Sequence, residues 1–182
     1  MSERIATQKR RCLDTVIEIA KGNVVRDFLE SLKDLPRPAV GFAVKADLKM
    51  CTNGRGIGVF SAEFLPAGTR VDVDREEITF TREQAIEFLE AVPNDNERRW
   101  WLEHIYCLDG LMKIDMAELD ISMVNHSNDP NVVTRENGLD YTTRDVNIGE
   151  ELTEDYKTYD KVSYYEELCQ KYGVIHYCSE WT

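Results

Sequence analysis

The sequence predicts an α+β fold in which strands predominate. Residues 39–80 alternate short β-forming runs with Gly-containing turns. The pair Asn137-Gly138 lies between two further β-forming runs, a strong hairpin signal because both residues tolerate positive φ. Between these regions, residues 81–110 carry two successive helix-start signals. The 182 residues suit one domain with a helical extension.

The N-terminal stretch at residues 9–33 predicts helix, because apolar residues recur at three- and four-residue steps. Gly22-Asn23 should split or bend it. We expect these helices to pack against the rest of the domain. Pro36-Arg37-Pro38 then predicts an extended linker. The recurring apolar residues are Leu13, Val16, Ile17, Ala20, Val24, Phe28 and Leu32.

Strands and turns follow one another in the next stretch. Residues 40–44 predict a short strand, and residues 54–58 predict a Gly-rich turn that leads into a strand at 59–61. Residues 65–68 predict a second turn, and the alternation over residues 69–73 predicts another strand.

Two helices are predicted next. Thr81 with Gln84 forms a capping-box pattern, and Pro93 stops that helix. Asn94 with Glu97 repeats the pattern for a second helix, which is expected to end near Gly110. This helix carries Trp100, Trp101, His104, Ile105 and Cys107. Adjacent helical positions point about 100° apart, so core packing of at least one tryptophan is favoured over a ligand cage.

The C-terminal third combines a polar loop with a hairpin. A short strand and a turn are expected within residues 111–121, and a polar run at 125–131 precedes the hairpin. The hairpin should fold the chain back and bring the polar run close to Tyr156. Ser163 with Glu166 is expected to cap a last helix, which Gly173 ends.

Charge points to the class of partner. The net charge is -12 and the pI is about 4.7. Such a balance disfavours direct binding to nucleic acid or to an anionic membrane, and it favours a basic protein partner.

The cysteines and apolar runs indicate a compartment. Five cysteines are scattered without a CxxC or Cys-His cluster, so neither a disulfide framework nor a metal site is predicted. Reduced thiols suit an intracellular location. No apolar run approaches 18 residues, and the N-terminus lacks a signal-peptide core, so no membrane segment is predicted.

The Gly-rich turn could serve a ligand, but not in a nucleotide-binding motif. A strand and no helix follows Gly56-Ile57-Gly58, which disfavours a dinucleotide site, and no GK[ST] triplet occurs to form a P-loop. Either the glycines let a ligand approach the backbone, or they form a bare tight turn.

The polar run does not predict nucleophilic catalysis. His126 and Ser127 are adjacent on an irregular loop and no GxSxG elbow occurs, so a catalytic triad is disfavoured. Asn125 and His126 could instead bond backbone groups within a tight loop. The acidic pairs Glu76-Glu77 and Glu150-Glu151 predict solvated strand ends.

Taken together, three motifs are far more specific than any one alone. A G-x-G-V-F-S turn from Gly56, an N-H-S-x-D-P-N run from Asn125 and a G-E-E-L-T-x-D-Y segment ending at Tyr156 occur in this order. Over residues 40–160 they resemble the SET-domain family of protein lysine methyltransferases. The resemblance implies a fold of small β-sheets, with a knot-like substructure formed by the polar run and the chain around Tyr156. The helical stretch at 81–110 would be the variable insert of the family.

The same resemblance implies domain boundaries and cofactor roles. It suggests a SET domain at 39–160; the periodicity and capping patterns described above predict a helical extension at residues 1–38 and a C-terminal helix and tail at 161–182. The cofactor would be S-adenosylmethionine. The backbone of Gly56, Ile57 and Gly58 would contact it, and Asn125 and His126 would bind its amino-acid and adenine portions.

Roles at the reacting centre are implied as well. Tyr156 would be the active-site tyrosine at the methyl-transfer point, and Tyr159 would line the channel for the substrate lysine. Three departures from the family pattern are present, one of which is that residues 1–38 match no part of it. Asn128 stands where many members have the cysteine of a C-terminal zinc cluster, and Glu154 stands where Phe or Tyr often tunes the number of methyl groups transferred. A carboxylate at Glu154 could hold an ammonium group and oppose its deprotonation.

The leading hypothesis is a protein-lysine N-methyltransferase that uses S-adenosylmethionine and acts on a basic protein, histone or another Lys-rich chain. A second is a SET-like module that binds cofactor or peptide with weak or no turnover, motivated by Glu154. A third is a structural adaptor that uses the helices at 9–33. A homodimer is compatible with those apolar helices.

Overall fold

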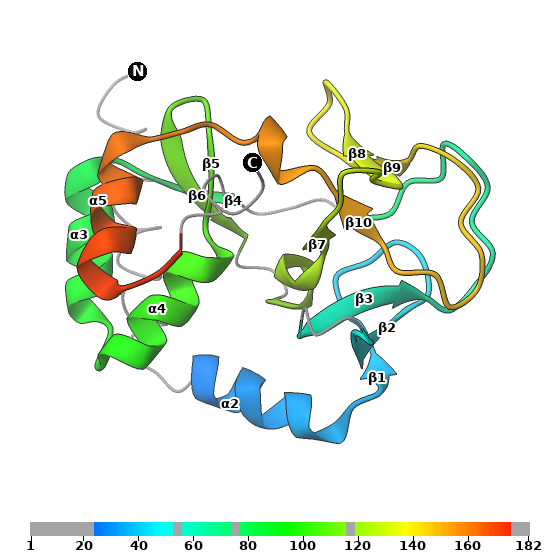
Figure 1. The fold of residues 1–182 in the computed structure, drawn as a ribbon, viewed down its shortest axis with the longest axis horizontal. Coiled ribbons are helices and arrows are strands. Elements are labelled where there is room, and N and C mark those ends of the chain that lie inside the picture. Colours follow the sequence, from blue (N-terminus) through cyan, green and yellow to red (C-terminus); the bar gives the residue numbers. More distant parts are fainter. Residues whose placement is uncertain (1–23, 53–55, 74–76, 116–118, 176–182) are drawn as a thin grey trace, which may run out of the picture. The chain divides into compact units, whose positions relative to one another are not determined.

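The computed structural model describes residues 24–52, 56–73, 77–115 and 119–175 (Figure 1). The chain divides into two compact units, each assembled from separate stretches of sequence. Unit 1 consists of Met1–Glu30, Glu77–Ile114 and Tyr159–Thr182, and unit 2 consists of Ser31–Glu76 and Asp115–Thr158. The domain boundaries expected at 38 and 160 remain a prediction. None of the described helices is both long enough and apolar enough to traverse a membrane.

Unit 2 is built from small sheets. Its largest sheet has the antiparallel order β1-β2-β3, with Lys49 of β2 opposite Gly58 of β3. β8 and β9 form the hairpin predicted around Asn137-Gly138, which is confirmed. β7 and β10 form a two-residue parallel pair. The bounds are β1 Arg37–Pro38, β2 Ala46–Met50, β3 Ile57–Ser61, β7 Asn125–His126, β8 Val132–Thr134, β9 Asp140–Thr142 and β10 Thr153–Glu154, with short 3-10 helices η1 Leu32–Asp34, η2 Leu119–Met123 and η3 Tyr156–Thr158.

The strand expected at residues 40–44 is wrong. Gly41 has φ +89°, and only Phe42 in this stretch makes a bridge, to Asp72. The strand lies instead at Ala46–Met50, where Ala46 and Leu48 are buried between more exposed polar neighbours. That alternation is itself a strand signal. The strand expected at residues 69–73 is reduced to isolated bridges at Arg70 and Asp72.

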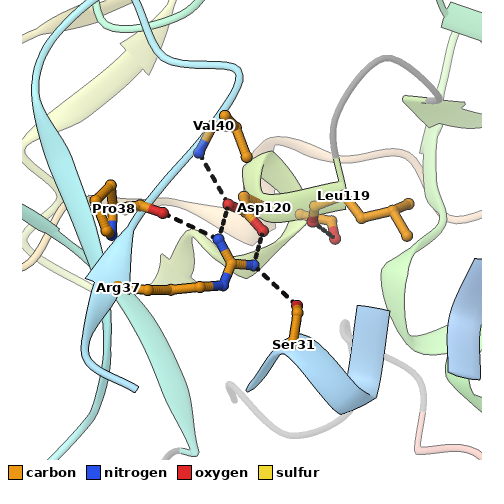
Figure 2. A network of polar contacts seen from close by, with 7 residues as sticks. Ser31, Arg37, Pro38, Val40, Leu119 and Asp120 are labelled. Carbon is orange, nitrogen blue, oxygen red and sulfur yellow. Dashed lines mark hydrogen bonds and ion pairs between the residues drawn. The ribbon is translucent and has the colours of Figure 1, made fainter. Parts of the chain in front are cut away.

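An ion pair ties the start of unit 2 to η2 (Figure 2). Both terminal nitrogens of Arg37 donate to the two carboxylate oxygens of Asp120, each at 2.7 Å. The backbone N–H of Val40 donates to the same carboxylate at 2.9 Å, and Arg37 also donates to Ser31 Oγ at 3.3 Å and to the Pro38 carbonyl. The hydrogen bond to buried Asp120 raises the pKa of Arg37. The predicted linker at 36–38 is therefore extended, as expected, and its Arg37 also forms an ion pair with Asp120.

Unit 1 combines helices with a three-stranded sheet in which β5 and β6 are antiparallel. The sheet has the order β4-β6-β5. The helices α3, α4 and α5 lie next to one another (Figure 1). Tyr165 of α5 donates to the Leu102 carbonyl of α4 at 2.7 Å, and Arg82 of α3 pairs with Glu167 of α5. The bounds are α2 Val24–Ser31, β4 Glu77–Phe80, α3 Arg82–Ala91, α4 Asp95–His104, β5 Tyr106–Leu108, β6 Leu111–Asp115 and α5 Ser163–Tyr172.

The described part of the predicted N-terminal helix is helical. α2 and η1 cover residues 24–34, and Phe28 packs edge-on against Trp100 with ring centroids 5.6 Å apart. The predictions for residues 9–23, including the break at Gly22-Asn23, lie outside the described residues. Trp100 and Trp101 are both buried, so the core-packing interpretation is confirmed.

Local capping signals predicted the helix starts well. Gln84 N–H donates to Thr81 Oγ1 and Thr81 N–H donates to Gln84 Oε1, so this capping box is confirmed. Asn94 Oδ1 accepts from the Glu97 N–H at 3.0 Å, which confirms the second start. The prediction that Ser163 with Glu166 caps the last helix is wrong, because Ser163 is the first helical residue of α5, the cap position is Val162, and no side chain caps this helix.

The expected end of the second helix near Gly110 is wrong. α4 ends at His104, and β5 and β6 form a hairpin whose turn contains Asp109 at φ +57° and Gly110 at φ +72°. An Asp-Gly pair between β-formers is a hairpin signal, and it outweighs the helical periodicity here. Gly173, with φ +67°, ends α5 as predicted.

His104 makes the stability of unit 1 sensitive to acid. Its Nδ1 lies 2.6 Å from the Trp100 carbonyl and its ring stacks on Trp100. Burial lowers the pKa of His104 to about 4, while the bond to the Trp100 carbonyl opposes this shift. The unfolded chain takes up a proton near its ordinary pKa, so stability present above about pH 6.5 should be lost as the pH falls toward 4.

We expect this loss to reach about 1–3 kcal/mol, measured as unfolding free energy by urea denaturation at several pH values. His104→Gln, which can still donate to the Trp100 carbonyl, should remove that part of the pH dependence. Parallel stability curves for the two proteins between pH 6.5 and 4 would contradict this assignment.

Candidate functional site

The parallel pair β7–β10 brings together the polar run and the segment that ends at Tyr156. Asn125 lies opposite Thr153 and His126 lies opposite Glu154. The Ser127 N–H donates to the Glu154 carbonyl at 2.9 Å and extends the pairing. Parallel strands need a crossover, and the chain between them supplies it with the β8–β9 hairpin. The prediction that folding back would bring these two segments together is confirmed.

Asn125 connects the polar run to the Gly-rich turn. Its Nδ2 donates to the Ile57 carbonyl at 3.0 Å and to Glu151 Oε1 at 2.9 Å. The Cys51 thiol donates to the same Glu151 oxygen at 3.3 Å. We call Cys51, Gly58, Asn125 and Glu151, with the Ile57 carbonyl, the Asn125 cluster. The interpretation of Glu151 as a solvated strand end is therefore wrong, because its carboxylate faces this cluster.

The two glycines of the turn are required for different reasons. Gly56 has φ +86°, and a Cβ there would meet nothing within 4 Å, so the backbone conformation requires glycine. Gly58 is a buried strand residue without positive φ. A Cβ there would lie 2.6 Å from Glu151 Oε1, 2.8 Å from Cys51 Sγ and 3.0 Å from Asn125 Nδ2. The absence of a side chain at Gly58 therefore leaves room for the side chains of Glu151, Cys51 and Asn125.

His126 and Tyr156 are linked through the backbone. The Tyr156 N–H donates to His126 Nδ1 at 3.1 Å, and the two rings lie 5.5 Å apart. His126 is 5% exposed, and the same Nδ1 lies 3.6 Å from Asp155 Oδ1. Nδ1 therefore acts as the acceptor nitrogen of the ring in this hydrogen bond. Asn125 and His126 bond backbone groups as expected, but the expected tight loop is wrong, because the two residues form β7 and their partners Ile57 and Tyr156 are distant in sequence.

The hydroxyl of Tyr156 has a defined direction. It donates to the Val124 carbonyl at 2.6 Å, immediately before Asn125 in the chain. Tyr156 begins η3 directly after β10. Its hydroxyl proton is therefore committed, and toward any further group its oxygen acts as an acceptor.

Two residues that sequence reasoning missed hold the segment before Tyr156. Asn131 is buried; its Nδ2 donates to the Glu151 carbonyl at 2.8 Å, and its Oδ1 accepts from the Thr153 N–H at 2.9 Å. Glu151 is the second. The only sequence signal for Asn131 was its place at the end of the polar run, where asparagine also suits a turn.

The predicted channel residues lie in different units. Glu154 is a half-buried residue at the end of β10 in unit 2. Tyr159 belongs to unit 1, where its ring lies 5.3 Å from that of Tyr106. The roles expected of Glu154 and Tyr159 beside a substrate lysine remain predictions.

The SET domain family model matches residues 56–157. Among solved structures, the chain is similar to a humanized mutant of the Chaetomium thermophilum Polycomb Repressive Complex 2 bound to the inhibitor GSK126, with 17% identity and a TM-score of 0.47. That match covers 70% of this chain but only 16% of the other. A Plasmodium falciparum protein assigned as a histone methyltransferase matches with 16% identity and a TM-score of 0.41, over 62% of this chain and 93% of that one.

No curated protein sequence matches the chain. The family match contains all three predicted motifs and spans more than half of the 182 residues. The predicted resemblance and the mixed fold of small sheets are confirmed, and the chain belongs to the SET domain family.

Proposed function

We propose that this protein is an S-adenosylmethionine-dependent protein-lysine N-methyltransferase that acts on a basic protein segment, with histone as the first substrate to test. The observation that carries the proposal is the convergence, within unit 2, of the Gly-rich turn, Asn125 and Tyr156. Membership of the SET domain family supports the same reaction.

The polar groups of unit 2 suit the proposed cofactor. Both amide hydrogens of Asn125 are used by acceptors, whereas its Oδ1 makes no hydrogen bond to any described residue. An outward acceptor of this kind suits the ammonium group of the cofactor's amino-acid portion. Gly56 and Ile57 are partly exposed and would offer main-chain contacts, and His126 would bind the adenine portion. When bound, the cofactor supplies an electrophilic methyl group on a positively charged sulfur.

Tyr156 would position the substrate amine. A free lysine has a pKa near 10.4, so its neutral form costs about 4–5 kcal/mol at pH 7. With its own proton committed to the Val124 carbonyl, the Tyr156 oxygen can accept an N–H of the neutral amine and direct the nitrogen lone pair toward the methyl group. Most of the rate gain would then come from orientation.

Charge supports a basic substrate. The chain carries 34 acidic and 22 basic residues, so a Lys/Arg-rich segment would be attracted over a distance and its association would weaken with salt.

The test is incubation of the full chain with methyl-labelled S-adenosylmethionine and histone. We expect label on lysine side chains, with less transfer as salt rises, and none to a histone preparation whose lysines have been acetylated. Calorimetry measures cofactor binding in parallel. Absence of cofactor binding would reject the proposal and favour a structural adaptor.

Glu154 favours a second candidate, a SET-like module that binds cofactor or peptide without efficient turnover. A carboxylate two residues before Tyr156 could stabilise a substrate ammonium and oppose its deprotonation. Cofactor binding by calorimetry without transfer to any basic protein would favour this candidate over the first.

A further inference from the structure

We propose that Glu151 is a positioning residue for cofactor binding: it fixes the amide of Asn125 so that Oδ1 faces the ammonium group of the cofactor. This inference rests on the proposed function. It adds a role for Glu151 that acts through Asn125 and not through contact with the cofactor.

The carboxylate of Glu151 is held in place from several sides. Its Oε1 accepts from Asn125 Nδ2 at 2.9 Å and from the Cys51 thiol at 3.3 Å. Its backbone forms a bridge with Phe60 of β3, and its carbonyl accepts from Asn131 at 2.8 Å. Since both main chain and side chain are anchored, Glu151 can act as a fixed acceptor.

A fixed acceptor determines which end of the Asn125 amide points outward. The Ile57 carbonyl and the Glu151 carboxylate can only accept hydrogen bonds, so the NH₂ group must face them. Two bonds use both hydrogens and define the plane of the amide. With Glu151 replaced by a residue that cannot accept, Asn125 Nδ2 would keep its bond to the Ile57 carbonyl and a weak contact to Cys51 Sγ at 3.6 Å, and the amide would be less firmly held.

Gly58 independently supports a requirement for the contact between Glu151 and Asn125. In a buried strand position without positive φ, glycine weakens the strand, yet any Cβ there would collide with Glu151, Cys51 and Asn125. Glycine is thus a weak strand residue at a position where a side chain would displace the Glu151 carboxylate from Asn125.

Two variants with uncharged side chains of similar length distinguish the effect of the hydrogen-bond acceptor at position 151 from the effect of its negative charge. Glu151→Gln keeps an acceptor oxygen, whereas Glu151→Met lacks one. Calorimetry on the full chain measures the affinity for S-adenosylhomocysteine, which carries the amino-acid portion, and for 5′-methylthioadenosine, which lacks it.

We expect Glu151→Met to weaken S-adenosylhomocysteine binding by about 10- to 100-fold, the usual effect of losing a hydrogen bond to a charged group, and to change 5′-methylthioadenosine binding by less than about twofold. Glu151→Gln should stay within about threefold of the original chain. In an Asn125→Ala background, Glu151→Met should have no further effect, because the two residues act as one unit.

Other results overturn the inference. Equal losses for Gln and Met would assign the effect to charge, and equal losses for both ligands would assign it to a general structural role. Unchanged binding by Glu151→Met would reject the positioning role while leaving the proposed function intact. If the original chain binds neither ligand, the proposed function fails first and this inference fails with it.

Discussion

Replacing Tyr156 by Phe is expected to lower methyl transfer by about 10²–10³-fold, the range found when one oriented hydrogen-bonding group is removed from an active site. Cofactor affinity should change by less than about threefold, because Asn125 and the Gly-rich turn are unaffected. The lost hydroxyl is the group that would accept an N–H from the amine, so the effect should fall on kcat. Labelled transfer to histone and calorimetry with S-adenosylhomocysteine measure the two quantities.

A matched control lies in the same unit. The hydroxyl of Tyr141 accepts from Asn137 Nδ2 at 3.1 Å in the β8–β9 hairpin. Tyr141→Phe removes a hydroxyl of the same kind and should leave transfer unchanged. Tyr156→Phe also leaves the Val124 carbonyl without this donor, at a cost of about 1–3 kcal/mol in stability, so the assay belongs well below the melting temperature. Transfer by Tyr156→Phe equal to that of Tyr141→Phe would remove Tyr156 from the reaction.

The second large effect concerns stability. Asp120→Ala should lower the unfolding free energy by about 3–5 kcal/mol, because it leaves the Arg37 guanidinium largely buried without its counter-ion. The Val40 N–H would lose its acceptor as well. Denaturation in urea followed by far-UV circular dichroism is the suitable measurement, since the two described tryptophans lie in unit 1.

An exposed ion pair provides the comparison. Arg82 and Glu167 lie 2.8 Å apart with their side chains 53% and 62% exposed, whereas the side chain of Asp120 is 2% exposed. Arg82→Ala should cost no more than about 1 kcal/mol. The double variant Arg37→Met/Asp120→Leu should cost much less than the sum of Arg37→Met and Asp120→Leu measured alone. Equal costs for Asp120→Ala and Arg82→Ala would show that burial of the first pair has no energetic consequence.

Signals confined to a few residues were sufficient for much of the fold. The capping box at Thr81 and Gln84 and the Asn137-Gly138 turn depend on neighbours in sequence, and both are present in the structure. Where two local signals compete, one must give way: helical periodicity continues to Asp109-Gly110, but that pair is also a hairpin signal, and the structure has the hairpin.

Contacts between distant residues could not be predicted in this way. The ion pair of Arg37 and Asp120 spans 83 positions, and the bond between Asn125 and the Ile57 carbonyl spans 68. An acidic pair such as Glu150-Glu151 is solvated in most proteins, so its sequence alone gives no reason to place Glu151 beside an amide. The hairpin at Asn137-Gly138 predicted that the polar run with Asn125 would lie close to Tyr156, but nothing predicted the hydrogen bond from Asn125 to the Glu151 carboxylate.

The interleaving of the two units affects how the protein is made. Ile57 and Arg37 leave the ribosome long before the side chains that bond them, because Asn125 and Asp120 belong to the second stretch of unit 2. All of these residues follow the middle segment of unit 1, Glu77–Ile114, and Glu151 and Tyr156 emerge last. Contacts of such high sequence separation form slowly. The nascent β1-β2-β3 sheet must therefore wait for its partners, and the site is completed only after Tyr156 has been synthesised.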